Sequence, residues 1–310
     1  MEQSESFYGH GKLLLSGEYY ILDGAIGLAL PTRVGQKLKV KYRPSYDPHL
    51  NWKSFGHNKD LWYEGKFEFW HFTSLDKRNC PVSSFLEKLL RQARLQNTHF
   101  LREEMDVNVE TYLEFPLDWG LGASSTLIHN VAQWAYISPF ELYFKTSVGS
   151  GYDVACAQAG GPILYSKSPS GPTFSPTVFN PSFKDNLFFI YLGKKQNSAE
   201  SVQHYQNHAG KSEAQVKLIT EITQEMIKTR DLVAFEKLVF DHEKIVSGGL
   251  DLYPIKKVRF SDYWGEVKSL GGWGGDFALV TSDRTPAETH QYFLSKGLEV
   301  FIPYEELILS

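Results

Sequence analysis

A glycine-rich turn at residues 120–125, with the sequence GLGASS, constrains the fold of this chain more than any other segment. Apolar and polar residues alternate at 105–115 before it, a pattern that predicts a half-buried strand. Residues 126–136 after it contain no glycine or proline and predict a helix. A strand, a glycine turn and a helix in this order are compatible with an anion site at the helix N-terminus. A plain turn with a serine helix cap is the alternative.

A phosphate group needs several donors that converge on it, and backbone N–H groups supply them where no side chain blocks the approach. Gly120 and Gly122 permit such an approach, and the hydroxyl groups of Ser124 and Ser125 can reach a phosphate oxygen or a magnesium ion. The patterns GxxxxGK[ST] and GxGxxG are both absent, which disfavours a nicotinamide enzyme. The predicted nucleotide-binding residues of this turn are Gly120, Leu121, Gly122, Ala123, Ser124 and Ser125.

The remaining periodicity predicts a mixed α+β chain. The predicted elements are a helix around residues 85–93, a strand at 187–192, a helical stretch at 212–246 with a break near 230–231, a strand at 277–281, a helix at 287–296 and a strand at 298–302. A segment rich in serine and proline, residues 166–182, separates two better patterned regions. We therefore expect two domains, residues 1–175 and residues 176–310.

Composition excludes several classes of protein. With 310 residues and a net charge of −4, the chain has no global field that would attract nucleic acid or an anionic membrane. It has no apolar run of membrane-spanning length and no signal-like start, so we expect a cytoplasmic protein. The two cysteines, Cys80 and Cys156, lack CxxC spacing, which argues against a structural zinc site.

Three segments, in the same order along the chain, resemble the three motifs of the GHMP kinases. HGKLLLSGEYYIL at 10–22 resembles the first motif, PLDWGLGASS at 116–125 the central one and LGGWGGDFALV at 270–280 the third. This superfamily includes galactokinase, homoserine kinase, mevalonate kinase and phosphomevalonate kinase. The first segment is more similar to mevalonate and phosphomevalonate kinases than to sugar kinases.

The resemblance implies an α+β fold with two lobes. The N-terminal lobe would be an α/β lobe that binds ATP, the C-terminal lobe would have a ferredoxin-like α+β core, and ATP would lie between them. The segment GSGYDVA at 149–155 resembles the one that carries the catalytic aspartate in mevalonate-type kinases, which assigns that role to Asp153. Lys12 would be its electrostatic partner, and Ser124 would bind magnesium.

The resemblance also implies residues on the nucleotide and acceptor sides. The third motif would add Gly272, Gly274 and Gly275 to the nucleotide site, and the substrate side would contain Glu18, Lys195 and Ser198. Ordinary structural roles remain open for several of these residues. Asp153 also fits a helix N-cap, Lys12 a solvated strand end, and Asn197 with Glu200 a capping box.

Three positions depart from the family pattern. His10 replaces a proline in the first motif, and Trp273 replaces a small residue in the third. Between Ser124 and Asp153 the single acidic residue is Glu141, which does not match the magnesium-binding glutamate of mevalonate kinases. The metal site would then depend on Ser124, water and ATP oxygens.

These patterns predict a kinase that uses ATP and Mg²⁺ to phosphorylate an alcohol or phosphate group of a small acidic metabolite, with mevalonate or phosphomevalonate as the leading substrate. Two alternatives remain. One is a catalytically inactive nucleotide-binding regulator with the same fold. The other is an enzyme like the diphosphomevalonate decarboxylases, which Asp153 disfavours because those enzymes lack an aspartate at this point. We expect a monomer or a homodimer, without nucleic-acid or membrane partners.

Overall fold

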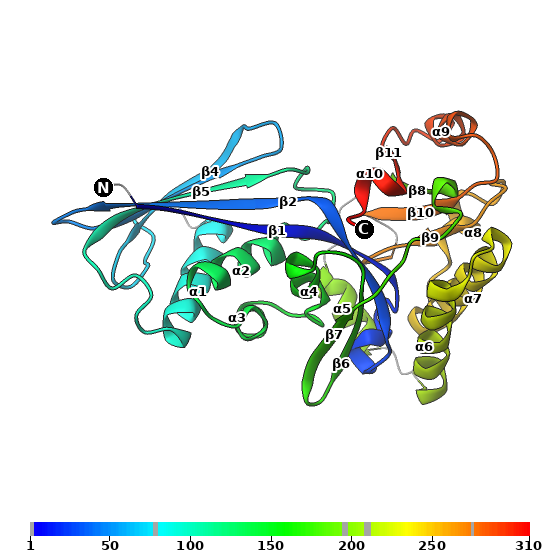
Figure 1. Cartoon of the computed structure of the whole chain (residues 1–310), viewed down its shortest axis with the longest axis horizontal. Helices are drawn as coiled ribbons and strands as arrows, with labels where there is room; N and C mark the ends of the chain where they lie inside the picture. The colour runs from blue at the N-terminus through cyan, green and yellow to red at the C-terminus, as the bar shows by residue number, and fades with distance from the viewer. Residues whose placement is uncertain (1–2, 77–79, 194–197, 208–211, 274–275) are drawn as a thin grey trace. The chain divides into compact units, whose positions relative to one another are not determined.

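The computed structural model describes residues 3–76, 80–193, 198–207, 212–273 and 276–310 (Figure 1). The packing of the backbone divides the chain into two compact units. Unit 1 comprises Met1–Gly11, Val34–Leu117 and Gly122–Gln158, and unit 2 comprises Lys12–Arg33, Asp118–Leu121 and Ala159–Ser310. The lobe boundary between residues 175 and 176 stays a prediction.

Unit 1 is built on a sheet of long strands. The strands are β1 (Gln3–Ser16), β2 (Gly27–Pro44), β3 (His49–Phe55), β4 (Leu61–Glu68) and β5 (Met105–Leu113), of which β1 and β2 contribute residues to both units. Within the unit the strands pair in the order β4-β3-β5-β2, and β1 also pairs with β2. Strands β3 and β5 are parallel, whereas β5 and β2 are antiparallel.

Helices cover one face of this part of the sheet (Figure 1). They are α1 (Pro81–Gln96), α2 (Ala123–Trp134), α3 (Pro139–Thr146) and α4 (Tyr152–Gln158). Val107 and Val109 lie two residues apart on β5, so both point to the same face, where they join a core that includes Leu89 and Leu90 of α1. This alternation is the one that the sequence predicts for residues 105–115.

Unit 2 contains a four-stranded antiparallel sheet. Its strands are β8 (Leu187–Tyr191), β9 (Val267–Ser269), β10 (Phe277–Thr281) and β11 (Phe301–Pro303), in the spatial order β11-β8-β10-β9. Helices separate β8 from β9, and one helix joins β10 to β11, which is the βαββαβ order of a ferredoxin-like core. The mixed α+β class and the ferredoxin-like C-terminal core are both as expected.

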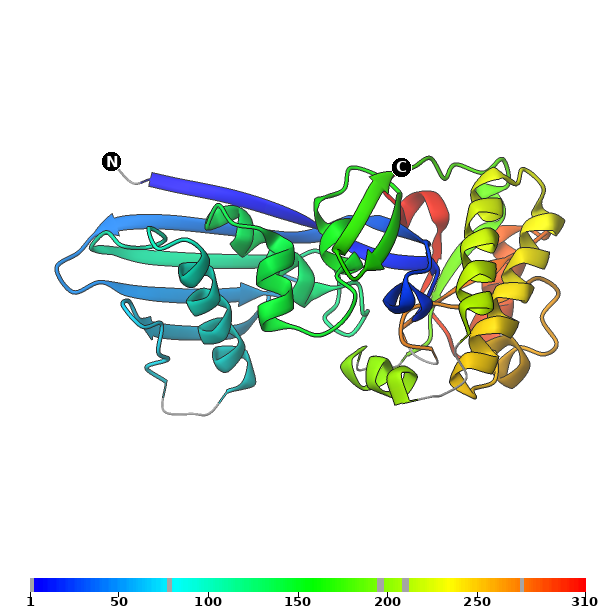
Figure 2. The same ribbon diagram turned by 90° about the horizontal axis from the view of Figure 1, so that it is seen from below.

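Two long helices of unit 2, α6 (Glu213–Lys228) and α7 (Leu232–Leu250), lie side by side (Figures 1 and 2). The Asp231 side chain accepts a hydrogen bond from the N–H of Ala234 and begins α7, while Thr229 is extended and ends α6. The helix break predicted near residues 230–231 therefore has a local cause. The other helices of this unit are η1 (Tyr20–Asp23), η2 (Lys184–Asn186), α5 (Ser198–Asn207), α8 (Ile255–Arg259), α9 (Pro286–Ser295) and α10 (Tyr304–Leu307).

Two element predictions differ from the structure. The segment rich in serine and proline contains much of a hairpin formed by β6 (Ile163–Ser168) and β7 (Gly171–Pro176). Its prolines lie near the ends of β7 or outside the strands, where they are compatible with strand pairing. The strand predicted at residues 298–302 is shorter and displaced, since β11 begins at Phe301.

Candidate active site

The glycine turn of the central segment leads into α2, which runs for 12 residues. Gly120 has a φ of 67°, and Gly122, the N-cap of α2, has a φ of 93°, a region that glycine enters at low cost. Because Gly122 has no side chain, no capping side chain within the described residues competes with an anion for the leading N–H groups of α2. Ser124 is exposed, and Ser125 is buried.

Asp153 lies in the first turn of α4, and its side chain is partly buried. Helix α4 packs against α2 within unit 1. The helices that carry Ser124 and Asp153 are thus direct neighbours, with each residue in the first turn of its helix.

Lys12 belongs to unit 2 and is 7% exposed, so it is not a solvated lysine at a strand end. Its backbone N–H donates to the carbonyl of Leu121, with a donor–acceptor distance of 3.0 Å. This bond joins the first segment that resembles a GHMP motif to the glycine turn, although the two lie more than 100 residues apart.

Glu18 is 1% exposed and lies in a buried cluster of ionisable side chains. Its carboxylate accepts a hydrogen bond from the ammonium group of Lys268, which is itself completely buried in β9. Its second oxygen lies 3.2 Å from Nε2 of His242 on α7. Burial raises the pKa of the Glu18 carboxyl, and the charge of Lys268 opposes that shift.

The imidazole of His242 is neutral. Its Nε2 accepts the backbone N–H of Gly17 at 3.0 Å, which places the ring proton on Nδ1. Burial and the neighbouring Lys268 hold the pKa of this imidazole well below its ordinary value. The contact between His242 and Glu18 is therefore not an ion pair between charged groups.

Glu243 completes this cluster. One of its oxygens lies 3.7 Å from Nζ of Lys268, and burial raises the pKa of its carboxyl to about 8. One ammonium group thus faces two buried carboxyl groups, and the raised pKa keeps Glu243 largely protonated at neutral pH. The proton on Glu243 therefore removes a second negative charge from beside Lys268.

The third segment folds back onto residues from the first segment and the glycine turn. Trp273 has a φ of 49° and packs in a buried aromatic cluster with Tyr19, Tyr20 and Tyr205. The large side chain of Trp273 is accommodated in this cluster. The Asp276 side chain, 6% exposed, lies directly against Gly120.

Several predicted site residues are not fully described. Gly274, Gly275 and Lys195 lie outside the described residues, and Ser198 is the first residue of α5 with a side chain outside them. Gly272 lies in the described loop that precedes β10. The roles of these five residues stay predictions.

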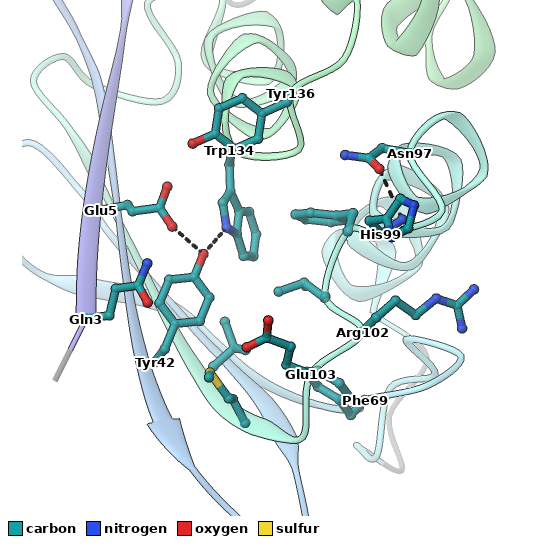
Figure 3. Close-up of a pocket in the computed structure, with 14 residues that line it drawn as sticks. Gln3, Glu5, Tyr42, Phe69, Asn97, His99, Arg102, Glu103, Trp134 and Tyr136 are labelled. Atoms are coloured by element: carbon teal, nitrogen blue, oxygen red, sulfur yellow. Dashed lines mark hydrogen bonds between the residues drawn. The ribbon is translucent and has the colours of Figure 1, made fainter. Parts of the chain in front are cut away.

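A separate cavity of about 350 Å³ lies in unit 1 beside Trp134, at the C-terminal end of α2 and so opposite to the glycine turn (Figure 3). Polar side chains that line the cavity form hydrogen bonds with one another. The Tyr42 hydroxyl donates to Glu5 at 2.8 Å and accepts from Trp134 Nε1 at 2.6 Å. The side chain of Arg102 points away from the cavity (Figure 3). This cavity shares no residue with the three segments.

Within the described ranges, no group of three or more histidine, cysteine, aspartate or glutamate side chains is arranged to hold a metal ion. None of the helices in the part of the chain that the structure describes is both long and apolar enough to cross a membrane.

The sequence motifs did not indicate Lys268, His242 or Glu243. One signal was available in the sequence: Lys268 lies between Val267 and Ser269, just before the third segment. A lysine that is buried at such a position needs a charged partner, because an unpaired buried charge is costly. The partners of Lys268, Glu18 in the turn after β1 and Glu243 on α7, cannot be identified from local spacing.

No family model and no curated protein matches the chain, but solved structures do. The mevalonate kinase of Methanococcus jannaschii aligns at a TM-score of 0.69 and 14% identity, over 99% of this chain and 99% of that chain. The phosphomevalonate kinase of Streptococcus pneumoniae, solved with phosphomevalonate and AMPPNP, aligns at 0.67 and 17% identity, over 96% of this chain and 98% of that one.

A galactokinase from Lactococcus lactis, solved with galactose, aligns at a TM-score of 0.63 and 12% identity, over 95% of this chain and 88% of that chain. At such identities the likeness establishes the fold, and it extends over nearly the whole chain.

Proposed function

Because the chain has the GHMP kinase fold, we propose that it is a small-molecule kinase that transfers the γ-phosphoryl group of ATP to an acidic metabolite. The observation that carries this proposal is the glycine turn before α2. There no capping side chain within the described residues competes with an anion for the leading N–H groups of a 12-residue helix.

Phosphoryl transfer requires positioned reactants and stabilised negative charge more than covalent chemistry by the protein. In the proposed site, the glycine turn and the start of α2 bind the nucleotide phosphates. Asp153 accepts the proton of the attacking hydroxyl, and the ammonium group of Lys12 neutralises charge on the transferred group. Glu18, Lys195 and Ser198 remain proposed substrate-side residues.

Magnesium fits this donor set. The exposed hydroxyl of Ser124 in the first turn of α2 is a suitable oxygen ligand. Bound magnesium would supply charge neutralisation on the phosphates, and it commonly keeps several waters, so few protein ligands are required. ATP and Mg²⁺ are therefore the proposed cofactors.

For the acceptor, we propose mevalonate or phosphomevalonate. Support comes from the first segment, which resembles the first motif of mevalonate and phosphomevalonate kinases. Further support comes from the aligned structures of a mevalonate kinase and a phosphomevalonate kinase. The acceptor would place its hydroxyl or phosphate group beside Asp153.

A substrate panel tests the proposal. Purified protein with Mg²⁺ and ATP is incubated separately with mevalonate, phosphomevalonate, homoserine and galactose, and ADP release and the phosphorylated product are measured. We expect turnover with one of the two acidic isoprenoid precursors. Nucleotide binding with turnover only on galactose or homoserine would overturn the acceptor assignment, and turnover on none of the four would remove the kinase proposal.

One observation favours a nucleotide-binding regulator as the second candidate. The single acidic residue between Ser124 and Asp153 is Glu141, which does not match the magnesium-binding glutamate of mevalonate kinases. Glu141 lies in the first turn of α3, where its backbone N–H donates to the hydroxyl of Ser138. Tight binding of ATP without turnover on any acceptor would support this second function.

A further inference from the structure

A cavity of about 580 Å³ lies in unit 2, where β9 packs against both α7 and α8. None of the described residues that line it belongs to the three segments or to the predicted site residues. Its volume falls within the range of about 300–1,000 Å³ that is usual for pockets of small molecules. The cavity is therefore large enough for a ligand of its own.

Two exposed aromatic side chains line this cavity. The residues that α7 contributes are spaced at i, i+3, i+4 and i+7 and so share one face of the helix: Phe240, Glu243, Lys244 and Ser247. Phe240 is 52% exposed, and Tyr253, in the segment after α7, is 71% exposed. Large rings that remain open to solvent beside a cavity offer apolar surface to a ligand.

Three lysines also line the cavity, namely Lys244, Lys256 and Lys257. Nζ of Lys256 lies 2.8 Å from Glu266, so these two charges offset each other. The ammonium group of Lys257 lies 4.9 Å from the ring centroid of Tyr253, which is a cation–π contact. Neither Lys244 nor Lys257 forms an ion pair with any residue in the part of the chain that the structure describes. Two positive charges thus remain for an anion.

Glu243 does not cancel these charges. It is 3% exposed, and its carboxyl oxygens form no hydrogen bond with the described residues. The Lys268 ammonium is 3.7 Å away, beyond hydrogen-bond distance, and the Ser269 hydroxyl, which lowers the pKa of Glu243 to a smaller extent, has no hydrogen-bond partner among those residues either. Because burial raises that pKa to about 8, the carboxyl is largely protonated at neutral pH and does not repel an anion.

We propose that this cavity is a binding site for a small phosphomonoester with an apolar body. The phosphate group contacts Lys244 and Lys257, and the apolar body packs against Phe240 and Tyr253. A phosphomonoester carries nearly two negative charges at neutral pH, which match the two unpaired lysines. This inference goes beyond the proposed kinase function and does not depend on it.

NMR titration of the full chain with four probes tests the proposal. Phenyl phosphate combines the charge with an apolar ring, whereas inorganic phosphate lacks the ring, benzyl alcohol lacks the charge and benzoate carries a single charge. We expect the dissociation constant of phenyl phosphate to be at least about tenfold lower than those of inorganic phosphate and benzyl alcohol, and lower than that of benzoate. Equally tight binding of any one of the other three probes would overturn the proposed ligand class.

A pair of double variants locates the site. Lys244→Gln with Lys257→Gln should weaken the binding of phenyl phosphate at least about tenfold, because both charge-assisted contacts are lost. Lys217→Gln with Lys228→Gln is the matched control, since it removes two exposed lysines of α6 that do not line the cavity. Its affinity should stay within about twofold of the original chain. Equal affinities of the two double variants would mean that the probe binds elsewhere or responds only to net charge, and either result overturns the proposal.

The apolar side of the site is tested by Phe240→Ser. This substitution at an exposed position should weaken the binding of phenyl phosphate at least about threefold and leave that of inorganic phosphate unchanged, because only the ring of the ligand loses a contact. Unchanged binding of phenyl phosphate would remove the apolar contact from the proposal.

Discussion

The carboxylate of Glu18 accepts a hydrogen bond from the ammonium group of Lys268, 250 residues further along the chain, and both side chains are buried. The pair connects the turn after β1 to β9 inside unit 2. Its buried setting means that each charge depends on the other for its stability.

Replacement of Lys268 by methionine should destabilise the protein by about 3–5 kcal/mol, because it leaves the Glu18 carboxylate buried without a cation. The free energy of unfolding in urea measures the effect. Adding Glu18→Gln to Lys268→Met should recover part of the loss, since the unpaired charge is then gone. A double variant less stable than the sum of the single effects would contradict this coupling.

Glu243 predicts a pH dependence of stability. Its carboxyl has a pKa of about 8 in the folded chain, against an ordinary value of 4.5, so the folded state holds a proton that the unfolded state releases. Stability from this group is therefore greatest below pH 4.5 and decreases as the pH rises towards 8, by up to about 1.4 kcal/mol per pH unit. Unfolding in urea at several pH values measures the slope.

Glu243→Gln should flatten that slope, because glutamine does not titrate. Glu299→Gln is the matched control, as Glu299 is exposed and replacement there leaves the buried cluster intact. An unchanged slope in Glu243→Gln would show that other groups cause the pH dependence.

Gly120→Ala should destabilise the chain, since the new methyl group overlaps Asp276 and the left-handed backbone alone costs a residue with a side chain about 1–2 kcal/mol. Thermal unfolding measures the loss. Gly160→Ala is the control, because a Cβ atom at Gly160 meets nothing within 4 Å. Equal melting temperatures for the two variants would contradict the contact with Asp276.

Asp153→Asn should reduce kcat by at least about 100-fold if Asp153 accepts the hydroxyl proton, because proton transfer by a positioned group contributes about 10²–10⁴-fold to rate. Affinity for AMPPNP should remain within about twofold, since the carboxylate acts on the acceptor. The exposed Asp283→Asn variant serves as a control for the general effect of losing a carboxylate. Near-normal turnover by Asp153→Asn would remove this residue from its proposed role.

Trp273→Phe should leave stability unchanged or increase it slightly. The indole N–H of Trp273 is buried and makes no hydrogen bond within the part of the chain that the structure describes, and such a group costs about 1–3 kcal/mol. Phenylalanine keeps an aromatic ring in the cluster with Tyr19 and Tyr205 and removes the unsatisfied donor. A fall in melting temperature of several degrees would contradict this expectation.

Much of the local structure was predictable from the sequence. Alternation at residues 105–115 predicted β5, and apolar spacing predicted α1, α6 and α7, because strands and helices have fixed periods of 2 and 3.6 residues. Helix α2 was predicted from a run without glycine or proline after the glycine turn. The hairpin of β6 and β7 was not predicted, since prolines normally indicate loops and their edge positions become visible only when the strands pair.

The sequence by itself determined the glycine turn, the helix after it and the order of the three segments, because glycine backbone freedom and apolar periodicity are properties of neighbouring residues. Tertiary structure alone decided what lies against the turn. Asp276 meets Gly120, and Lys268 meets Glu18, only after the strands of unit 2 have paired. Contacts between residues 156 and 250 positions apart depend on packing, and no local pattern encodes their distance.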